Sequence, residues 1–367
     1  MQQTRLVSFK ISTIDPLGQG VSKITDKITF IPKTLPGEEG EAVVLESKKG
    51  VQFAELKVLK NSSSKRLTPE CAHFESCPGC HFLHTDYEHE IEFKKQSLEK
   101  ILQKLSPPPI QTFSAPRRLE YRNRIQLHYN LKKNLLGMLN GRTGQIAPTP
   151  NCLIGRPLIR KALNDLYQNN YWQKLIPPQS PSIGHVELYE QNDQLSISWN
   201  RPYADGGFTQ VYEEMNQLLK KHLLAWGEKF SSDHVIDLFA GQGNLSNEMK
   251  YSKRLCFDMY PKPVGPEFFS LNLYDEKALE KFEKIRSQLI PEQINFLILD
   301  PPRSGLKNLN EWVSKLQPLK MVYVSCDPHT LARDLASLSG YEILEVSLFD
   351  FFPSTFHFET MVFLEGK

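Results

Sequence analysis

The amino-acid sequence predicts an α/β protein in which a mostly parallel sheet, covered by helices, occupies the C-terminal half. After residue 233, the short apolar runs HVIDLFAG, LCFD, INFLILD and MVYVSC alternate with helical or loop stretches. Runs that are apolar throughout are typical of parallel strands buried on both faces. The N-terminal half has shorter, alternating β patterns, so we expect smaller β domains there.

Residues 1–62 predict a small OB-like barrel. Alternating runs such as KITFIPKT and EAVVLESKKGVQFAELKVL are separated by DPLGQG and LPGEEG. Glycine and proline at these breaks indicate tight turns, and several short strands at this spacing are typical of a small closed barrel. The polar stretch NSSSKR then predicts a linker.

The next part of the chain predicts a β-rich central domain and two helices. RIQLHYN, HVELYE and QLSISWN have the composition of strands, whereas DYEHEIEFKKQSLEKILQKL and VYEEMNQLLKKHLLAW repeat apolar residues at helical spacing. We therefore expect three domains. They are a barrel at 1–62, a cysteine-containing central β domain at 63–85 and 116–204, and the α/β domain at 86–115 and 205–367.

Composition narrows the class of protein. The chain has 367 residues, of which 40% are hydrophobic, and a net charge of +2, so a nucleic-acid surface has to come from local clustering. The sequence shows neither a signal peptide nor an apolar run long enough to cross a bilayer, so we expect a cytoplasmic protein that does not bind membranes. Nothing indicates a dimer helix, so we expect a monomer without an obligate protein partner.

A glycine loop and acidic strand ends predict a cofactor site. DLFAGQGNLS places Gly241 and Gly243 after a strand, with Ser246 at the third glycine position, and Asp258 and Asp300 end two further strands. The glycine pair alone is equally compatible with an ordinary strand-to-helix turn. Ligands bind at the carboxyl ends of parallel strands, and acids without a nearby Lys or Arg suit ribose hydroxyls and an amino group. S-adenosylmethionine therefore fits better than a phosphate-rich cofactor.

Cys326 and Glu359 predict a nucleophile and a base. Cys326 ends MVYVS at the same edge of the sheet, and an ordinary thiol has a few per cent thiolate at neutral pH. Thiolate addition at uracil C6 would make C5 nucleophilic enough for methylation, after which a base must remove the C5 proton. Glu359 follows an aromatic stretch whose burial would raise the carboxyl pKa. The structural alternatives are a buried thiol and a surface carboxylate. Arg303 in DPPRSG stands where adenine-amino methylation requires an aromatic residue, which disfavours that reaction.

Four of the six cysteines predict one metal site in the central domain. Four thiolates suit either zinc or a [4Fe–4S] cluster. In the cytosol, where thiols stay reduced, clustered cysteines are expected to be metal ligands and not disulfide partners. The four are Cys71, Cys77, Cys80 and Cys152. A zinc site with three cysteine ligands and one histidine ligand is the alternative, because three histidines lie nearby, at positions His73, His81 and His84. Cys256 is expected to be a buried strand thiol.

The segment 117–142 predicts an RNA-binding surface. It interleaves basic residues with aromatic ones and contains a single acid, Glu120. Basic groups can neutralise phosphates, and rings can stack on unpaired bases. The residues are Arg117, Arg118, Arg122, Arg124, Lys132, Lys133 and Arg142, with Tyr121, His128 and Tyr129. A solvated strand face is the alternative. Because the target uridine must leave its stack, we expect a loop or unpaired site in folded RNA.

The chain resembles the RNA uracil-C5 methyltransferases over nearly its whole length. The resemblance is carried by four motifs that occur in the order DLFAGQGN, LDPPRSG, VSCDPHTLARDL and FPSTFHFET. The resemblance implies a Rossmann-like S-adenosylmethionine domain, a TRAM domain in the first sixty residues and a [4Fe–4S] cluster on the four cysteines. It implies that Cys326 is the nucleophile and Glu359 the general base. It also implies six cofactor contacts, namely Gln210, Phe239, Asn244, Asp258, Asn272 and Asp300.

The chain departs from this family in one region. Asp258 stands where the family usually has Glu, and the segment from Asp258 to Asp300 is short, with no clear helix in DMYPKPVGPEFFSLNLYD. We expect methylation of uridine C5 in structured RNA, most of all 23S ribosomal RNA, because the barrel and the cysteines are often absent from the transfer RNA branch. The alternatives are a tRNA uridine-C5 methyltransferase and a non-catalytic RNA-binding iron–sulfur protein with a decayed methyltransferase domain. Cytosine-C5 methylation is disfavoured, since Cys326 does not follow a proline.

Overall fold

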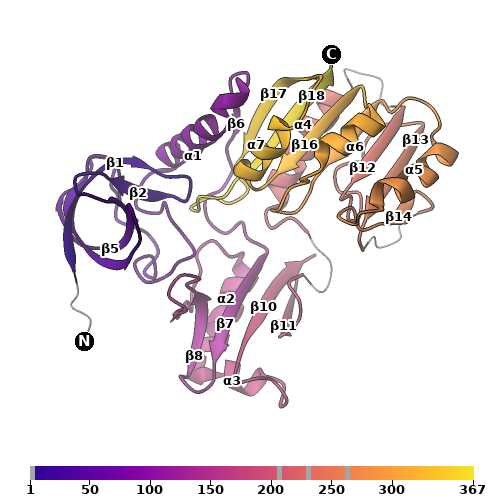
Figure 1. Ribbon diagram of the computed structural model, residues 1–367. Coiled ribbons are helices and arrows are strands. Elements are labelled where there is room, and N and C mark those ends of the chain that lie inside the picture. Colours follow the sequence, from indigo (N-terminus) through magenta and orange to yellow (C-terminus); the bar gives the residue numbers. More distant parts are fainter. Residues whose placement is uncertain (1–4, 205–208, 229–232, 261–264) are drawn as a thin grey trace. The chain divides into compact units, whose positions relative to one another are not determined.

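The computed structural model describes residues 5–204, 209–228, 233–260 and 265–367 (Figure 1). The chain divides into two compact units, of which the first contains residues 1–94, 116–213 and 352–356 and the second contains 95–115, 214–351 and 357–367. The three-domain division stays a prediction, and its boundary at 204/205 adjoins residues 205–208, which lie outside the described residues.

The first unit begins with the closed five-stranded barrel that the sequence predicts. Its strands run in the order β1-β2-β3-β5-β4, and the alternating residues Phe9, Ile11 and Ile31 form its buried core. The strands are β1 (Leu6–Ile14), β2 (Gln19–Ser22), β3 (Ile28–Pro32), β4 (Glu39–Ser47) and β5 (Val51–Asn61). Closure pairs β3 with β5 in parallel, while the other pairs are antiparallel.

The second sheet of this unit has five strands in the order β11-β10-β7-β8-β9, all paired antiparallel. They are β7 (Arg124–Asn130), β8 (Leu135–Leu139), β9 (Ile146–Ala147), β10 (Ile183–Gln191) and β11 (Gln194–Trp199). The strands predicted at RIQLHYN, HVELYE and QLSISWN are confirmed. The unit also contains short helical segments that the sequence analysis did not predict: α2 (Pro157–Tyr167), η2 (Gln168–Asn170) and α3 (Trp172–Leu175).

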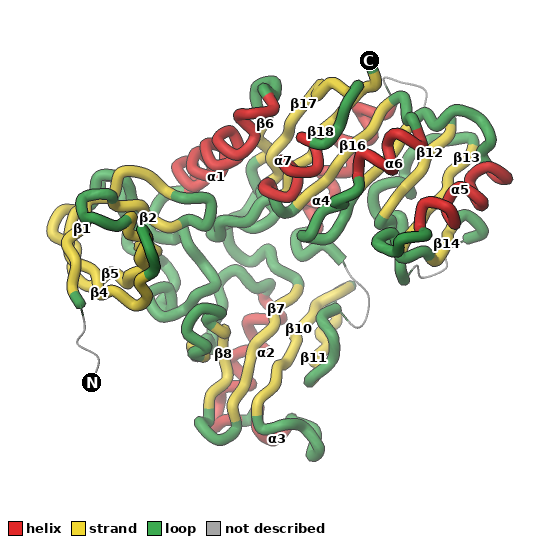
Figure 2. The backbone as a smooth tube through the Cα atoms, viewed as in Figure 1, coloured by secondary structure: helices red, strands yellow, loops and turns green. Residues whose placement is uncertain are grey.

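The second unit is built on an eight-stranded sheet, in the order β14-β13-β12-β15-β16-β18-β17-β6 (Figure 2). The strands from β14 to β16 pair in parallel, and β18 joins β16 antiparallel. The strands are β6 (Gln111–Phe113), β12 (His234–Leu238), β13 (Lys253–Asp258), β14 (Phe268–Ser270), β15 (Phe296–Leu299), β16 (Lys320–Ser325), β17 (Tyr341–Phe349) and β18 (Glu359–Gly366). This order reverses at β12, as in Rossmann-like sheets, so the predicted α/β class is confirmed.

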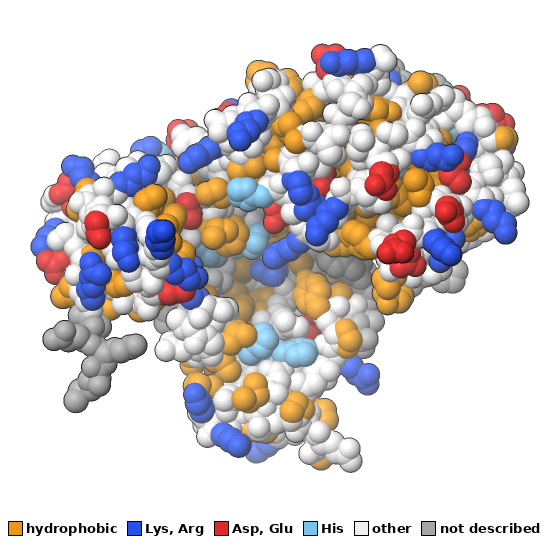
Figure 3. Space-filling model, in the orientation of Figure 1, with side chains coloured by type: hydrophobic (Ala, Val, Ile, Leu, Met, Phe, Trp, Pro, Cys, Tyr) orange, Lys and Arg blue, Asp and Glu red, His pale blue; other side chains and the backbone are white. Residues whose placement is uncertain are grey.

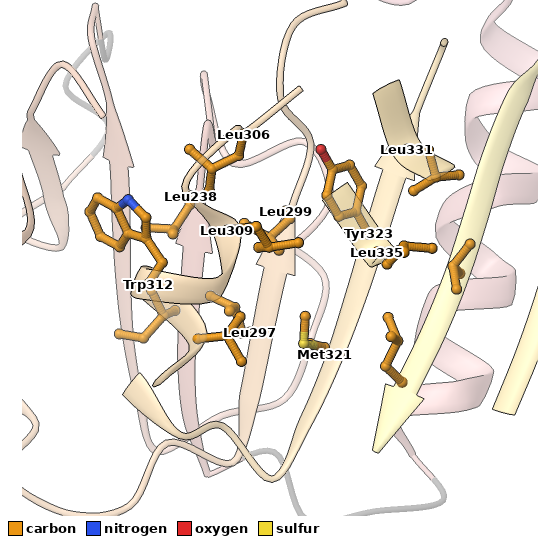
Figure 4. Packing of buried hydrophobic residues seen from close by; sticks show 14 of the residues in the cluster. Leu238, Leu297, Leu299, Leu306, Leu309, Trp312, Met321, Tyr323, Leu331 and Leu335 are labelled. Carbon is orange, nitrogen blue, oxygen red and sulfur yellow. The ribbon is translucent and has the colours of Figure 1, made fainter. Parts of the chain in front are cut away.

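Helices cover both faces of this sheet. On one face, Phe282 of α5, Trp312 of α6 and Leu331 of α7 pack into the same core as Leu297 and Tyr323 of the sheet (Figure 4). On the other face, the Trp226 ring of α4 stacks on Phe363 with centroids 4.1 Å apart. The helical segments are α1 (Tyr87–Leu102), η1 (Gln103–Leu105), α4 (Glu213–Gly227), α5 (Ala278–Leu289), α6 (Leu309–Leu316) and α7 (Pro328–Ala336).

Two further observations concern the charges on the surface and the hydrophobicity of the helices. Lys and Arg side chains are mixed with Asp and Glu over the face drawn in Figure 3, in keeping with the small net charge. Among the described helices, none is long and apolar enough to cross a membrane.

Candidate active site

Cys326 lies between the end of β16 and the start of α7. Asp327 caps the helix, since its carboxylate accepts hydrogen bonds from the backbone N–H groups of His329 (2.9 Å) and Thr330 (3.1 Å). Pro328 occupies the first turn, where its fixed φ favours helix formation. The Ser325 hydroxyl donates to the Asp327 carbonyl at 3.0 Å. The backbone is therefore fixed on both sides of the thiol.

The surroundings of Cys326 favour a protonated thiol. The pKa of Cys326 is raised to about 12, chiefly by burial and next by the carboxyl groups of Glu359 and Asp300, while Arg303 opposes the rise through its charge and a side-chain hydrogen bond. The thiolate of Cys326 is therefore less populated in the resting site than that of a free thiol. Arg303 is the group in contact with this thiol that favours the thiolate form.

Glu359 is the first residue of β18 and is buried, with 6% of its surface exposed. The alternative of a surface carboxylate is thus excluded. Burial raises the pKa of Glu359 well above its ordinary range, the charge of Asp300 raises it further, and Arg303 opposes both. Glu359 is therefore protonated at rest, as expected for a carboxyl group in an apolar setting.

Asp300 and Arg303 complete a group of four interacting side chains at the carboxyl edge of the sheet. Asp300 follows β15, and burial, followed by the charge of Asp237, raises its pKa to about 7. Arg303 interacts with both Cys326 and Glu359. Arg303 was not predicted to belong to the site, although its position in DPPRSG, two residues after Pro301, places it at the same edge of the sheet.

The glycine loop follows β12 and contacts the neighbouring strand end. The Gly241 N–H donates to Oδ2 of Asp258 at 3.0 Å, and φ is +56° at Gly241 and +76° at Gly243. A Cβ atom at Gly243 would lie 2.3 Å from Asn247 Oδ1, whereas nothing lies within 4 Å of a Cβ at Gly241. Glycine is therefore required sterically at one position and leaves open space at the other.

Ser246 explains the missing third glycine of this loop. Its hydroxyl donates to Oδ2 of buried Asp237 at 2.5 Å and accepts from Arg254 at 3.1 Å. Burial raises the pKa of Asp237 to about 7. The loop is thus held by a buried polar network that includes Arg254, and the side chain bonded to the Gly241 backbone is the carboxylate of Asp258. This donor set fits the ribose and amino groups of S-adenosylmethionine better than phosphates.

Asn244 and Asn272, two further predicted cofactor contacts, both form hydrogen bonds within the protein. Asn244 forms a reciprocal amide pair with Asn216 of α4, with N–O distances of 2.9 and 3.0 Å. Asn272 uses both polar atoms within its own turn, accepting from the Tyr274 N–H (3.1 Å) and donating to Asp275 (2.7 Å). The side chain of Asn272 is thus engaged locally, so the expected adenine contact has no support in the structure.

Two side chains near the glycine loop were missed by the sequence analysis. Tyr274 lies with its ring centroid 5.6 Å from that of Phe239, and its hydroxyl donates to the Gly305 carbonyl at 2.9 Å. Asn216 is the second, and its position, the sixth residue of the predicted helix and the fourth of α4, gave no signal that it pairs with the loop. In the described part of 258–275 there is no helix, as predicted.

Gln210 belongs to the first unit, whereas the other five predicted cofactor contacts belong to the second. The Asn123 amide donates to the Gln210 carbonyl at 3.0 Å, so the backbone at this position is fixed to the central sheet. Residues 206–208 of the motif GGFTQ lie outside the described residues.

The four predicted metal ligands lie in the first unit and form no disulfide. Burial raises the pKa of Cys80, and the charges of Cys152, Cys77 and Cys71 raise it further, so the four sulfurs are close enough to interact. The Gly79 N–H donates to Cys77 Sγ at 3.4 Å. Within the described ranges, however, the structure shows no group of three or more Cys, His, Asp or Glu side chains arranged to hold a metal ion.

Lys33 and two histidines surround the cysteine segment. The Lys33 ammonium donates to the carbonyls of Glu75 (2.9 Å) and Cys77 (3.2 Å), and also to that of Phe74. Burial lowers the pKa of His81 to about 4 and that of His84 to about 3, so both rings are neutral at physiological pH. Neutral imidazoles are the ligand form, which keeps the zinc alternative chemically open.

The basic segment 117–142 is only partly available for RNA. Arg124 is buried and pairs with Glu187 at 2.6 Å, and Tyr121 and Tyr129 are fully buried, so the prediction that they contact RNA is wrong. The Arg142 guanidinium stacks over the Phe53 ring at 3.8 Å. Four cationic residues of the segment are exposed, namely Arg117, Lys132, Lys133 and Arg142.

A family model and a solved structure indicate the class of protein that this chain resembles. Residues 264–367 match the family model described as tRNA (Uracil-5-)-methyltransferase. The crystal structure of Pyrococcus abyssi tRNA (uracil-54, C5)-methyltransferase in complex with S-adenosyl-L-homocysteine has a TM-score of 0.69, covers 98% of this chain and all of its own, and is 20% identical. At that identity the likeness shows the fold alone. Together with the relatives below, the family match confirms the predicted resemblance to the RNA uracil-C5 methyltransferases.

The full-length relatives are more specific. The 23S rRNA (uracil(1939)-C(5))-methyltransferase RlmD of Shewanella frigidimarina is 26% identical, with 99% of this chain and 96% of the relative covered. The protein of the same name from Vibrio vulnificus strain CMCP6 is 29% identical, with 97% and 95% covered. The Shewanella alignment spans 443 residues against 367 in this chain, so that relative contains segments without a counterpart here.

Proposed function

We propose that this protein transfers a methyl group from S-adenosylmethionine to C5 of a uridine in 23S ribosomal RNA. The observation that carries the proposal is the group formed by Asp300, Arg303, Cys326 and Glu359 at the carboxyl edge of the parallel sheet. It combines a thiol, a cation and two carboxyl groups of raised pKa, which suits addition to a pyrimidine followed by proton removal. The relatives that share nearly the whole chain are named for this reaction.

In this proposal the Cys326 thiol loses its proton to solvent, Arg303 favours the resulting thiolate, and that thiolate adds to C6 of the uracil. The new S–C6 bond shifts electron density to C5. S-adenosylmethionine, when bound, supplies the methyl group that C5 takes up. Glu359, after its resting carboxyl has given its own proton to solvent, removes the C5 proton as a carboxylate; the C5–H electron pair restores the C5–C6 double bond, and the Cys326 thiolate leaves. The raised pKa of Glu359 makes its carboxylate a stronger base.

The proposed cofactor contacts in the second unit are Phe239, Asn244, Asp258 and Asp300, and Gln210 of the first unit is proposed on the resemblance alone. The positive φ of Phe239 and of both glycines brings the backbone of the loop to the strand end that carries Asp258. Asn272 remains a proposed contact, but its side chain would first have to leave the turn that it forms with Asp275.

We also propose that the four cysteines hold a [4Fe–4S] cluster with a structural role. The support is the mutual effect of the four sulfurs on the pKa of Cys80 and a donor set that contains only thiols. The measurement is iron and acid-labile sulfide after anaerobic purification, with about four of each per chain expected. One zinc per chain with no sulfide would instead establish a zinc site, held either by the four thiolates or by three of them and a histidine.

The five-stranded barrel is proposed to act as a TRAM-like RNA-binding domain, together with exposed cations of the central domain. Lys132 and Lys133 lie in the turn between β7 and β8, where phosphates could reach both. We propose the cytoplasm as the compartment, because ribosomal RNA is the proposed substrate, and a monomer as the active form.

The experiment that tests the function is methyl transfer to purified RNA that lacks its native methylation. Unmethylated 23S ribosomal RNA and unmethylated tRNA are offered in parallel, and nuclease fragments are analysed by mass spectrometry for 5-methyluridine. We expect one modified fragment in 23S RNA and none in tRNA. Methylation of tRNA alone would establish the tRNA alternative. No methylation of either, with no binding of S-adenosylmethionine by calorimetry, would favour the decayed, non-catalytic alternative that the short 258–300 segment suggests.

A further inference from the structure

Helix α7 carries two charged residues that the proposed chemistry does not use. They are Arg333 and Asp334 in the motif VSCDPHTLARDL, one and a half to two turns after the helix begins beside Cys326. Asp334 is buried, with its side chain 1% exposed, whereas the Arg333 side chain is 42% exposed. A buried carboxylate at this place requires partners, and those partners identify its role.

Both oxygens of the Asp334 carboxylate are engaged. Oδ2 accepts from the Leu306 N–H and from the Tyr323 hydroxyl, each at 2.7 Å. Oδ1 accepts from two nitrogens of Arg333, at 2.8 and 2.6 Å. Arg333 in turn donates to the Ser304 carbonyl at 2.8 Å. The pair thus binds the backbone of the DPPRSG loop at two positions that flank Gly305.

The fit around Gly305 shows how closely the pair approaches the loop. Gly305 has φ +67°, and a Cβ atom there would lie 2.3 Å from Asp334 Oδ2 and 2.7 Å from an Arg333 nitrogen. On the loop itself, the Tyr274 hydroxyl donates to the Gly305 carbonyl at 2.9 Å. Three consecutive loop residues, Ser304 to Leu306, are therefore fixed by hydrogen bonds.

Arg303 is the residue immediately before this anchored stretch. Its side chain is long, and it interacts with the Cys326 thiol and with Glu359. Holding the backbone at Ser304 reduces the number of positions that the guanidinium can adopt, so less entropy is lost when it faces the thiol. The helix that begins beside the nucleophile also holds the loop that carries the opposing cation (Figure 4 shows Tyr323, Leu331 and Leu335 of this region).

We propose that Arg333 and Asp334 are positioning residues that hold the 303–306 loop so that Arg303 faces Cys326. This inference rests on the proposed function in one respect, namely that the Cys326 thiolate is the nucleophile. It predicts that loss of either residue weakens the thiolate through Arg303, without any contact between α7 and the substrate.

The test measures thiol reactivity and needs no RNA. The rate of Cys326 alkylation by iodoacetamide is followed on the Cys326 peptide by mass spectrometry, at one pH below the thiol pKa, where the rate is proportional to the thiolate fraction. Arg303→Met should slow alkylation about tenfold, which corresponds to a rise of roughly one unit in the pKa. Asp334→Asn and Arg333→Met should slow it in the same direction. Ser337→Ala, which removes a side-chain hydrogen bond to the Asp334 carbonyl, is the matched control and should leave the rate unchanged.

A double-mutant cycle separates positioning from a general loosening of the structure. If Asp334 acts through Arg303, Asp334→Asn should have no further effect once Arg303 is Met. Equal effects of Asp334→Asn in both backgrounds would overturn the inference, and so would an unchanged rate in the single variant. If Asp334→Asn does not fold, Arg333→Met carries the same cycle, because it removes the Ser304 contact and leaves Leu306 and Tyr323 bonded to Asp334.

Failure of the positioning inference can be distinguished from failure of the proposed function. On substrate RNA, we expect both α7 variants to lower kcat with KM for RNA unchanged, since Asp334 is buried and the Arg333 guanidinium is engaged by Asp334 and Ser304. A protein that is inactive on every RNA but shows the non-additive alkylation cycle would retain the positioning inference and lose the proposed function. An active protein with an additive cycle would lose the inference alone.

Discussion

Asp300→Asn should make the folded protein more stable at neutral pH while it removes activity. Asp300 is half-buried, and its pKa is raised from 3.8 to about 7, chiefly by burial. An acid whose pKa is higher in the folded than in the unfolded protein destabilises the fold as pH rises from the unfolded value through the folded value. The cost is therefore absent below about pH 4 and complete above about pH 7. At roughly 1.4 kcal/mol per unit, a shift of about three units corresponds to about 4 kcal/mol.

That figure is an upper bound, because Asp237 titrates over the same range and its charge contributes to the shift. Asn copies the neutral acid in size and hydrogen-bonding atoms, so the variant avoids the cost. We expect the free energy of unfolding in urea to be about 2–4 kcal/mol higher for Asp300→Asn than for wild type at pH 8, and equal at pH 4. Exposed Asp165→Asn is the control and should show no such gain. A gain of the same size at both pH values, or a loss at pH 8, would refute the reasoning.

Three further predictions concern the reaction and the cofactor. Glu359→Gln should accumulate a covalent RNA–protein adduct, visible on a denaturing gel, because addition and methylation do not need the base; no adduct with Cys326 intact would argue against Glu359 in that role. Asn216→Ala removes both hydrogen bonds that hold the Asn244 side chain and should weaken S-adenosylmethionine binding about tenfold by calorimetry, which corresponds to about 1.4 kcal/mol; unchanged affinity would exclude that positioning. Cys80→Ser should lower the iron content of anaerobically purified protein, and full iron retention would contradict its proposed role as a ligand.

Local patterns in the sequence were sufficient to predict the sheet and barrel architecture. The apolar runs at β12, β15 and β16 predicted a parallel sheet because strands buried on both faces are apolar over most of their length. Helix α2 was not predicted, although its buried residues Ile159, Ala162, Leu163 and Leu166 repeat at helical spacing. The segments on either side have the composition of strands, so the whole stretch was predicted to be rich in β structure.

Contacts between distant residues could not be predicted in this way. Arg124 has the sequence pattern of a surface cation within RIQLHYN, but it is buried against Glu187, 63 residues further along the chain. The pKa of Cys326 is raised by burial and by Glu359 and Asp300, and is opposed by Arg303; these side chains come from the loop after β15 and from the start of β18. Asn272 illustrates the converse, since its motif position suggested a cofactor contact while its own turn takes up its side chain.

The central claim is that Cys326 attacks C6 and that the C5 proton is then lost. It is tested most directly by tritium release from 23S ribosomal RNA carrying 5-tritiated uridine, with S-adenosylmethionine and anaerobically purified protein. We expect release that matches methyl incorporation and is absent in Cys326→Ala. Methyl incorporation without tritium release would place the methyl group on another atom, and release by Cys326→Ala would remove the thiol from the mechanism.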